Sequence, residues 1–121
     1  MTEVIAKFFD AWQVTDAEAR LVQVESAVTN EVEYLDPRTP EAVIGPIELN
    51  HYIGMFSANA PGWSANLVSS DITGNMTRAV VAFSGVGPDG NQQVQYGQYF
   101  VEYEGELISR MVGFVGIGRV D

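Results

Sequence analysis

One stretch of the sequence, residues 34–38 (YLDPR), combines side-chain types that could do chemistry. Strand side chains alternate between two faces, so Val32, Tyr34 and Asp36 share one face of an extended segment. A carboxylate that shares a face with an apolar and an aromatic side chain is out of place on a solvated surface. Pro37 favours an extended conformation at Asp36 and prevents strand pairing beyond it. We therefore predict that Asp36 lies at the mouth of an apolar pocket.

The chemistry expected of Asp36 is proton transfer. A carboxylate in an apolar pocket resists ionisation, so it can exchange protons with a ligand near neutral pH. The alternative is an Asp-Pro turn in which the carboxylate caps backbone N–H groups of the following loop. The residues alone leave both interpretations open. Arg38 follows directly and could gate the pocket mouth, although arginines in loops are usually solvated.

Two further residues could assist Asp36 if they face inward. Arg110 interrupts the apolar last strand; inside, it would need Asp36 or a ligand oxygen as its partner, because an unpaired buried charge is costly. Outside, turned by a bulge, it would pair with a surface acid. Tyr99 would offer a hydroxyl to a developing oxyanion if its face of the strand is the inner one. The opposite face, which carries Tyr96, is nearly as suitable for the interior.

The composition disfavours several classes of binding partner and of metal site. The 121 residues include six basic and sixteen acidic ones, and the net charge of -10 disfavours nucleic acid and anionic membranes as partners. Without cysteine and with His51 as the one histidine, neither a cysteine site nor a multi-histidine metal site is expected. His51 falls on the solvent side of its helix. We predict no metal, no cofactor and a cytoplasmic location, the last because no basic leader or long apolar run is present.

The positioning elements follow from periodicity and turn signals. Apolar side chains recur at helical spacing in the first half, which predicts three helices: residues 3–14, a second from a capping box at Thr15 and Glu18 to about Val28, and a third from Gly45-Pro46 to Ala60. Alternating segments predict strands over residues 31–36, 64–73, 77–86, 92–103 and 106–117, with residues 37–44 as a loop without periodicity. This is an α+β layout in a single domain spanning residues 1–121.

Four features in this order make the chain resemble a known superfamily. They are the aromatic helix segment 8–12, the strand ending at residues 34–37, the Gly45-Pro46 helix with Tyr52 and Phe56, and the final hairpin leading to Met111 and Phe114. The sequence resembles the nuclear-transport-factor-two-like superfamily, in particular its SnoaL-like and ketosteroid-isomerase-like branches. The resemblance implies a cone: a curved antiparallel sheet wrapped round three N-terminal helices, enclosing one apolar pocket.

The resemblance also assigns roles to residues. Asp36 matches the general base of ketosteroid isomerases, whose second essential acid would fall near Gly97 or Tyr99 and whose catalytic tyrosine would fall near Phe8 or Phe9. The chain thus keeps the base and lacks the usual oxyanion hole, so ketosteroid isomerisation itself is not expected, and Tyr99 is the substitute that we predict as a second catalytic residue. The predicted substrate-binding residues are Trp12, Tyr34, Tyr52, Phe56, Val81, Phe83, Arg110 and Phe114.

Together these expectations predict a protein that binds or transforms a small molecule. The chain is predicted to bind a small apolar oxygenated molecule in the cone pocket and to act as a cofactor-independent isomerase, cyclase or hydrolase with Asp36 as general base. The alternatives are a non-catalytic module for hydrophobic ligands and a dimerisation module whose pocket is filled with side chains. The resemblance implies a homodimer that forms through the outer face of the sheet.

Overall fold

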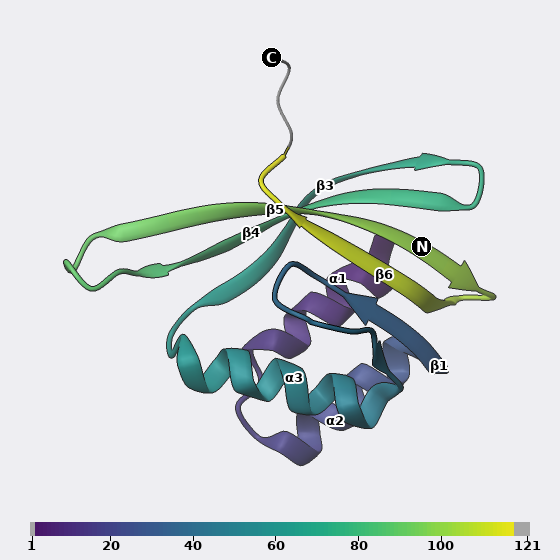
Figure 1. The fold of residues 1–121 in the computed structure, drawn as a ribbon, viewed down its shortest axis with the longest axis horizontal. Helices are drawn as coiled ribbons and strands as arrows, with labels where there is room; N and C mark the ends of the chain where they lie inside the picture. The colour runs from purple at the N-terminus through teal and green to yellow at the C-terminus, as the bar shows by residue number, and fades with distance from the viewer. Residues whose placement is uncertain (1, 118–121) are drawn as a thin grey trace.

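The computed structural model describes residues 2–117 and places helices on one side of a twisted sheet (Figure 1). The helical elements are α1 (Thr2–Asp10), the 3-10 turn η1 (Ala11–Gln13), α2 (Ala17–Ala27) and α3 (Pro46–Asn59). The strands are β1 (Val28–Leu35), β2 (Val43–Ile44), β3 (Ser64–Thr73), β4 (Met76–Val86), β5 (Gln92–Glu104) and β6 (Leu107–Val115). The predicted α+β class is confirmed.

The sheet within residues 2–117 has six strands in the order β2-β1-β6-β5-β4-β3. Its two edges, β2 and β3, do not meet, so the sheet curves over the helices without closing. The prediction of a purely antiparallel sheet is wrong at one place: β1 pairs with β6 in parallel, while the other neighbours are antiparallel. Parallel strands need a long crossover, and here α3 and the β3–β6 meander provide it.

Two local predictions differ from the structure near the N-terminus. The first helix ends at Asp10 and continues only as η1, which shortens the predicted span by one turn. The predicted capping box at Thr15 is wrong, because Asp16 caps α2 by accepting the Ala19 N–H at 2.9 Å. Aspartate is at least as good an N-cap as threonine, so the helix begins one residue later than expected. Within the predicted loop 37–44, Val43–Ile44 pair with β1 as a short edge strand.

The core lies between the helices and the inner face of the sheet. Its fully buried members include Phe8, Phe9, Ile53, Val81 and Ile108. The side-chain amide of Gln13 locks η1 to β3, since its Oε1 accepts the Ala65 N–H at 2.7 Å and its Nε2 donates to the Ala65 carbonyl at 3.3 Å. This clamp fixes η1, which carries Trp12, against the sheet.

A buried arginine fixes α3 against α2. Arg20 is 6% exposed; its Nε donates to Asn50 Oδ1 at 2.7 Å and its Nη1 donates to the Val14 carbonyl at 3.0 Å. Gly54 makes room for the guanidinium, because a Cβ at this position would lie 2.6 Å from Nη2. The close approach of the two helices holds in place the face of α3 that carries Tyr52.

A bulge in β6 determines which face Arg110 occupies. Glu102 pairs with Arg110 and the next β5 residue pairs with Ile108, so Ser109 has no partner in β5. The extra residue lets Ile108 and Met111 both point into the core and turns Arg110 outward. There its guanidinium lies 3.4 Å from Glu33 and 3.8 Å from Glu102, the residues beside it on the two neighbouring strands.

The outer face of the sheet also carries exposed apolar side chains, among them Val94, Tyr96 and Phe114. A homodimer that forms through this face stays a prediction. In the part of the chain that the structure describes, no helix is long and apolar enough to cross a membrane.

Candidate functional site

A cavity of about 210 Å³ opens between η1, α3 and the ends of β4, β5 and β6. Its wall is mostly aromatic and includes Trp12, Tyr52, Phe56, Trp63, Phe83 and Tyr99. The charged side chains that line it are Asp36 and Arg38, both from the turn that follows β1. The rings pack on each other edge to face: the Trp12 ring centroid lies 5.0 Å from that of Phe56 and 5.9 Å from that of Phe83. The cavity can therefore accept a flat apolar body and offers it one charge of each sign.

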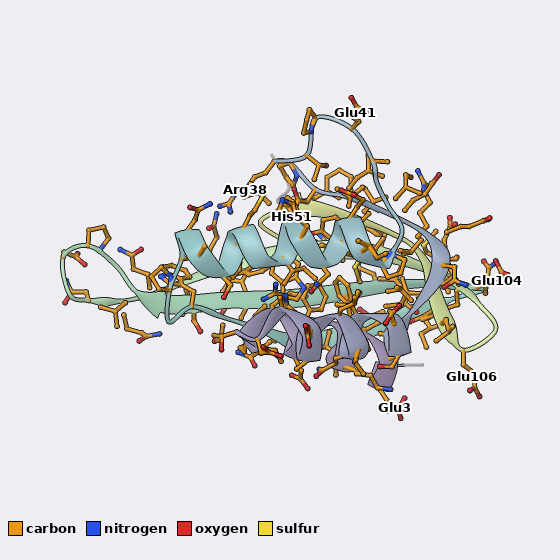
Figure 2. The ribbon with its side chains drawn as sticks, turned by 90° about the horizontal axis from the view of Figure 1, so that it is seen from below. Glu3, Arg38, Glu41, His51, Glu104 and Glu106 are labelled. Carbon is orange, nitrogen blue, oxygen red and sulfur yellow. The ribbon has the colours of Figure 1, made fainter. Side chains whose placement is uncertain are left out.

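A second hollow lies outside the core, between β2 and α3. It is a wider and more open groove of about 400 Å³, and His51 and Glu48 lie on its wall. His51 is exposed on α3, as predicted (Figure 2). No group of three His, Cys, Asp or Glu side chains within residues 2–117 is arranged to hold a metal ion.

The Asp36 carboxylate is held by three donors at the cavity mouth. Its Oδ2 accepts the hydroxyl of Tyr34 at 2.7 Å and that of Tyr52 at 2.5 Å. Its Oδ1 accepts the backbone N–H of Arg38 at 2.8 Å, while its own N–H donates to Thr39 Oγ1 at 3.1 Å. The capped Asp-Pro turn that the sequence allowed is therefore present, and the same carboxylate borders the cavity. One oxygen caps the turn, and the other accepts the two phenol hydroxyls.

A third phenol joins this group through Tyr34, because the hydroxyls of Tyr34 and Tyr99 lie 3.1 Å apart. A carboxylate only accepts hydrogen bonds, so the single hydroxyl proton of Tyr34 is used on Asp36. The proton between the two phenols then belongs to Tyr99, which donates to Tyr34. The result is a chain of hydrogen bonds from Tyr99 on β5 to Tyr34 on β1 and on to Asp36, with Tyr52 of α3 donating from the other side.

The phenols are held in their protonated form. Burial, the neighbouring Tyr99 and the charge of Asp36 raise the pKa of Tyr34 well above its ordinary value. Burial is also the largest cause that raises the pKa of Tyr52 and of Tyr99; the Asp36 charge adds to it and the Arg38 guanidinium opposes it. All three side chains therefore remain hydrogen-bond donors throughout the physiological pH range.

The structure brings seven of the ten predicted site residues to the cavity wall: Trp12, Asp36, Tyr52, Phe56, Phe83, Tyr99 and Phe114. Phe114 reaches only the rim, because its side chain is 55% exposed and its ring packs on Phe100, with centroids 5.8 Å apart, on the outer face. Tyr99 is 4% exposed and faces inward, which settles the strand parity that the sequence left open.

Three predicted site residues do not line the cavity. Tyr34 is fully buried behind it and reaches it only through the hydroxyls of its neighbours. Val81 is fully buried in the core on the inner face of β4. Arg110 lies on the opposite face of the sheet beside Glu33, so the partnership with Asp36 considered above does not form.

Sequence reasoning missed that three phenols meet around one carboxylate. Residues 34, 52 and 99 come from two strands and a helix, and no local pattern links them. It also left Arg38 out of the predicted site, although its position next to Asp36-Pro37 was the available signal. Arg38 lines the cavity, and Figure 2 shows it beside α3.

Replacing Tyr34 with phenylalanine tests the hydrogen-bond chain, because the ring is kept and only the central hydroxyl is lost. We expect the free energy of unfolding to fall by about 1–3 kcal/mol, since the buried Tyr99 hydroxyl loses its acceptor and Asp36 loses a donor. Urea denaturation measures the loss. The control is Tyr103→Phe, which removes one hydrogen bond, to Thr77, from a partly exposed side chain and should cost less. Equal losses for the two variants would contradict the predicted chain.

No model of a protein family and no curated protein matches the sequence, but many solved structures share its fold. A SnoaL-like protein from Agrobacterium tumefaciens is 25% identical, with a TM-score of 0.81, over 96% of this chain and 97% of its own. A SnoaL-like polyketide cyclase from Jannaschia sp. is 14% identical with a TM-score of 0.75, over 94% of this chain and 83% of its own.

A third neighbour, from Catenulispora acidiphila, has a ketosteroid-isomerase-like fold and was solved in complex with trimethylamine. It is 12% identical, with a TM-score of 0.75, over 92% of this chain and 83% of its own. The three alignments each span nearly the whole chain, and they agree with the layout of helices and sheet described above. The chain therefore has the nuclear-transport-factor-two-like fold, which it shares with SnoaL-like and ketosteroid-isomerase-like proteins.

Proposed function

We propose that this protein binds a small, flat, oxygenated molecule in the aromatic cavity and that Asp36 moves a proton on it. The observation that carries the proposal is the Asp36 carboxylate, which lies at the cavity and is held by the hydroxyls of Tyr34 and Tyr52. A carboxylate that only capped a turn would not need two phenols. Held in this way, it is pre-positioned for a ligand that enters among the rings.

The hydrogen bonds indicate which oxygen would act as the base. Oδ2 already accepts two hydroxyls, whereas Oδ1 accepts only the N–H of Arg38 and keeps a second lone pair. In the proposed step, Oδ1 takes a proton from the carbon beside a ligand carbonyl. The C–H bond breaks, an O–H bond forms on Asp36, and the electron pair moves to the carbonyl oxygen as an enolate. Tyr99 can turn its hydroxyl from Tyr34 to that oxygen.

The neighbours support small-molecule chemistry in this fold. The Agrobacterium and Jannaschia proteins are called an isomerase and a polyketide cyclase. A further neighbour, TerC, with a TM-score of 0.74 and 12% identity, was co-crystallised with polyporic acid. An isomerase or cyclase step that begins with an enolate is the reaction class that we propose, with a lactone-opening hydrolase as a variant that uses the same base.

The competing function is ligand binding without turnover, and hydrogen exchange separates the two. Neutral aryl alkyl ketones are incubated with the protein in D2O, and the loss of their α-hydrogen signals is followed by NMR. Catalysis predicts exchange that is faster than in buffer and saturates with ligand concentration. Quenching of Trp12 and Trp63 fluorescence reports binding in the same samples, because both indoles line the cavity. Binding without accelerated exchange would favour the non-catalytic module.

A further inference from the structure

Arg38 differs from the other arginines that the structure describes. Arg78 pairs with Asp71 at 2.7 Å, Arg110 lies between two glutamates, and Arg20 is buried and hydrogen-bonded to Asn50. Within residues 2–117, the Arg38 guanidinium forms neither an ion pair nor a hydrogen bond, although the protein has sixteen acidic residues. Lys7 has no ion pair either in the described part of the chain, but it lies away from the cavity, whereas Arg38 lines it.

The turn that carries Arg38 is fixed from both sides. The Arg38 N–H donates to Asp36 Oδ1 at 2.8 Å, and the N–H and Oγ1 of Thr39 both donate to the Asp36 carbonyl, at 3.1 and 3.0 Å. The carboxylate of Asp36, which lines the same cavity, is already engaged by two phenols and by this backbone N–H. The backbone of Arg38 is thus fixed at the mouth of the cavity, while its exposed guanidinium has no acid among the described residues to neutralise it and keeps its five N–H donors available.

We propose that Arg38 binds an anionic oxygen of the ligand, so that the ligand is an aromatic acid or an acidic enol. Its flat body would lie among Trp12, Phe56 and Phe83, and its carboxylate or enolate oxygens would meet the guanidinium at the mouth. A guanidinium presents paired N–H groups that match such oxygens bidentately. This inference rests on the proposed function only in using the same cavity, and it names the chemical class of the ligand.

The competing ligand class is an organic cation, which an aromatic wall and a carboxylate could also hold. Two features oppose it. The Arg38 charge would repel a cation at the mouth, and both lone pairs of Asp36 Oδ2 are occupied by the hydroxyls of Tyr34 and Tyr52. An amine would therefore bind beside one carboxylate that is already partly engaged and one guanidinium that repels it. The anionic oxygens of an acid would instead bind the Arg38 guanidinium, which has no other partner within residues 2–117.

Three probes with one aromatic body test the inference: 2-naphthoate, 2-naphthamide and 2-naphthylmethylamine. Their dissociation constants are measured at pH 7 by calorimetry on the wild-type protein and on Arg38→Met. We expect the wild type to bind the acid about 10- to 100-fold more tightly than the amide, the range for a hydrogen-bonded charge. Arg38→Met should lose this preference and bind the amide unchanged. Arg38→Lys should keep part of it, because the charge remains without the planar fork.

Arg78→Met is the matched control, because it removes an arginine from an exposed ion pair away from the cavity. It should leave all three dissociation constants unchanged. The inference is overturned if Arg38→Met keeps the preference for the acid, if the amine binds more tightly than the acid, or if the wild type does not bind 2-naphthoate at millimolar concentration. The hydrogen-exchange assay uses neutral ketones and does not depend on Arg38 binding an anion. Absence of exchange would contradict the proposed catalysis but not the preference for the acid, and loss of that preference would not contradict the catalysis.

Discussion

Asp36→Asn is expected to slow ligand hydrogen exchange by about 10²- to 10⁴-fold, the contribution of a positioned general base. An amide cannot take up the proton, so the loss should appear in kcat more than in KM. The substitution keeps the shape of the side chain, and the asparagine Oδ1 can still accept the Arg38 N–H. The amide nitrogen would face the two phenol hydroxyls, which can rotate to accept from it.

Two measurements keep this result interpretable. Urea denaturation of Asp36→Asn shows whether the turn and the cavity survive, and fluorescence quenching shows whether the ligand still binds. Asp71→Asn serves as the control, because Asp71 forms an exposed ion pair with Arg78 on the distant β3–β4 hairpin and should leave exchange unchanged. If Asp36→Asn retained the wild-type exchange rate, the general-base proposal would be wrong. Retained binding with lost exchange is the outcome that supports it.

Gly113→Ala is expected to lower the free energy of unfolding by about 1–3 kcal/mol, the usual cost of overpacking a core. A Cβ at Gly113 would lie 2.5 Å from Cε1 and 2.9 Å from Cζ of the Tyr99 ring. That ring is restrained on several sides, because it is 4% exposed, packs on Phe9 with centroids 5.0 Å apart, and is hydrogen-bonded to Tyr34. The variant should also displace the Tyr99 hydroxyl and so weaken ligand exchange.

Gly97→Ala is the matched control on the neighbouring strand. Its Cβ would meet Phe83 Cε2 at 3.3 Å and the Phe114 carbonyl oxygen at 3.4 Å, so the contact is tight but not impossible. Phe83 is only partly buried and borders the cavity, into which its ring can shift. Urea denaturation should therefore give a smaller loss for Gly97→Ala. Equal losses for the two variants would show that the Tyr99 ring is not held as tightly as its contacts indicate.

Local patterns in the sequence predicted most of the architecture. The alternation of apolar and polar side chains in β3, β4 and β5 is a property of consecutive residues, so it can be recognised in the sequence. The spans predicted for these strands agree with the structure to within one residue at each end. The face shared by Val32, Tyr34 and Asp36 was likewise a local property, and it placed Asp36 at the cavity. The parity of Tyr99 was ambiguous for a physical reason: Tyr96 and Phe100 make the other face of β5 aromatic as well.

The remaining features depend on contacts between distant residues. The extra residue at Ser109 moves Arg110 to the other face of the sheet. A bulge of one residue in an apolar strand has no sequence pattern by which it could be predicted. The parallel pairing of β1 with β6 depends on where the intervening meander ends. The meeting of the three phenols at Asp36 follows from that pairing and from the packing of α3, so it could be recognised only in three dimensions.

The parallel pairing of β1 with β6 also determines when the cavity can form during synthesis. β1 is made early, but apart from the two-residue β2 its strand partner is β6, which follows β3, β4 and β5 in the sequence. Until β6 has left the ribosome, β1 is not joined to the β3–β5 part of the sheet, and the side chains between β1 and the helices are not fully covered. Such long-range pairing slows folding and prolongs the exposure of apolar surface. The emergence of β6, rather than the growth of the first half of the chain, would then be the moment at which the group of Asp36, Tyr34 and Tyr99 is completed.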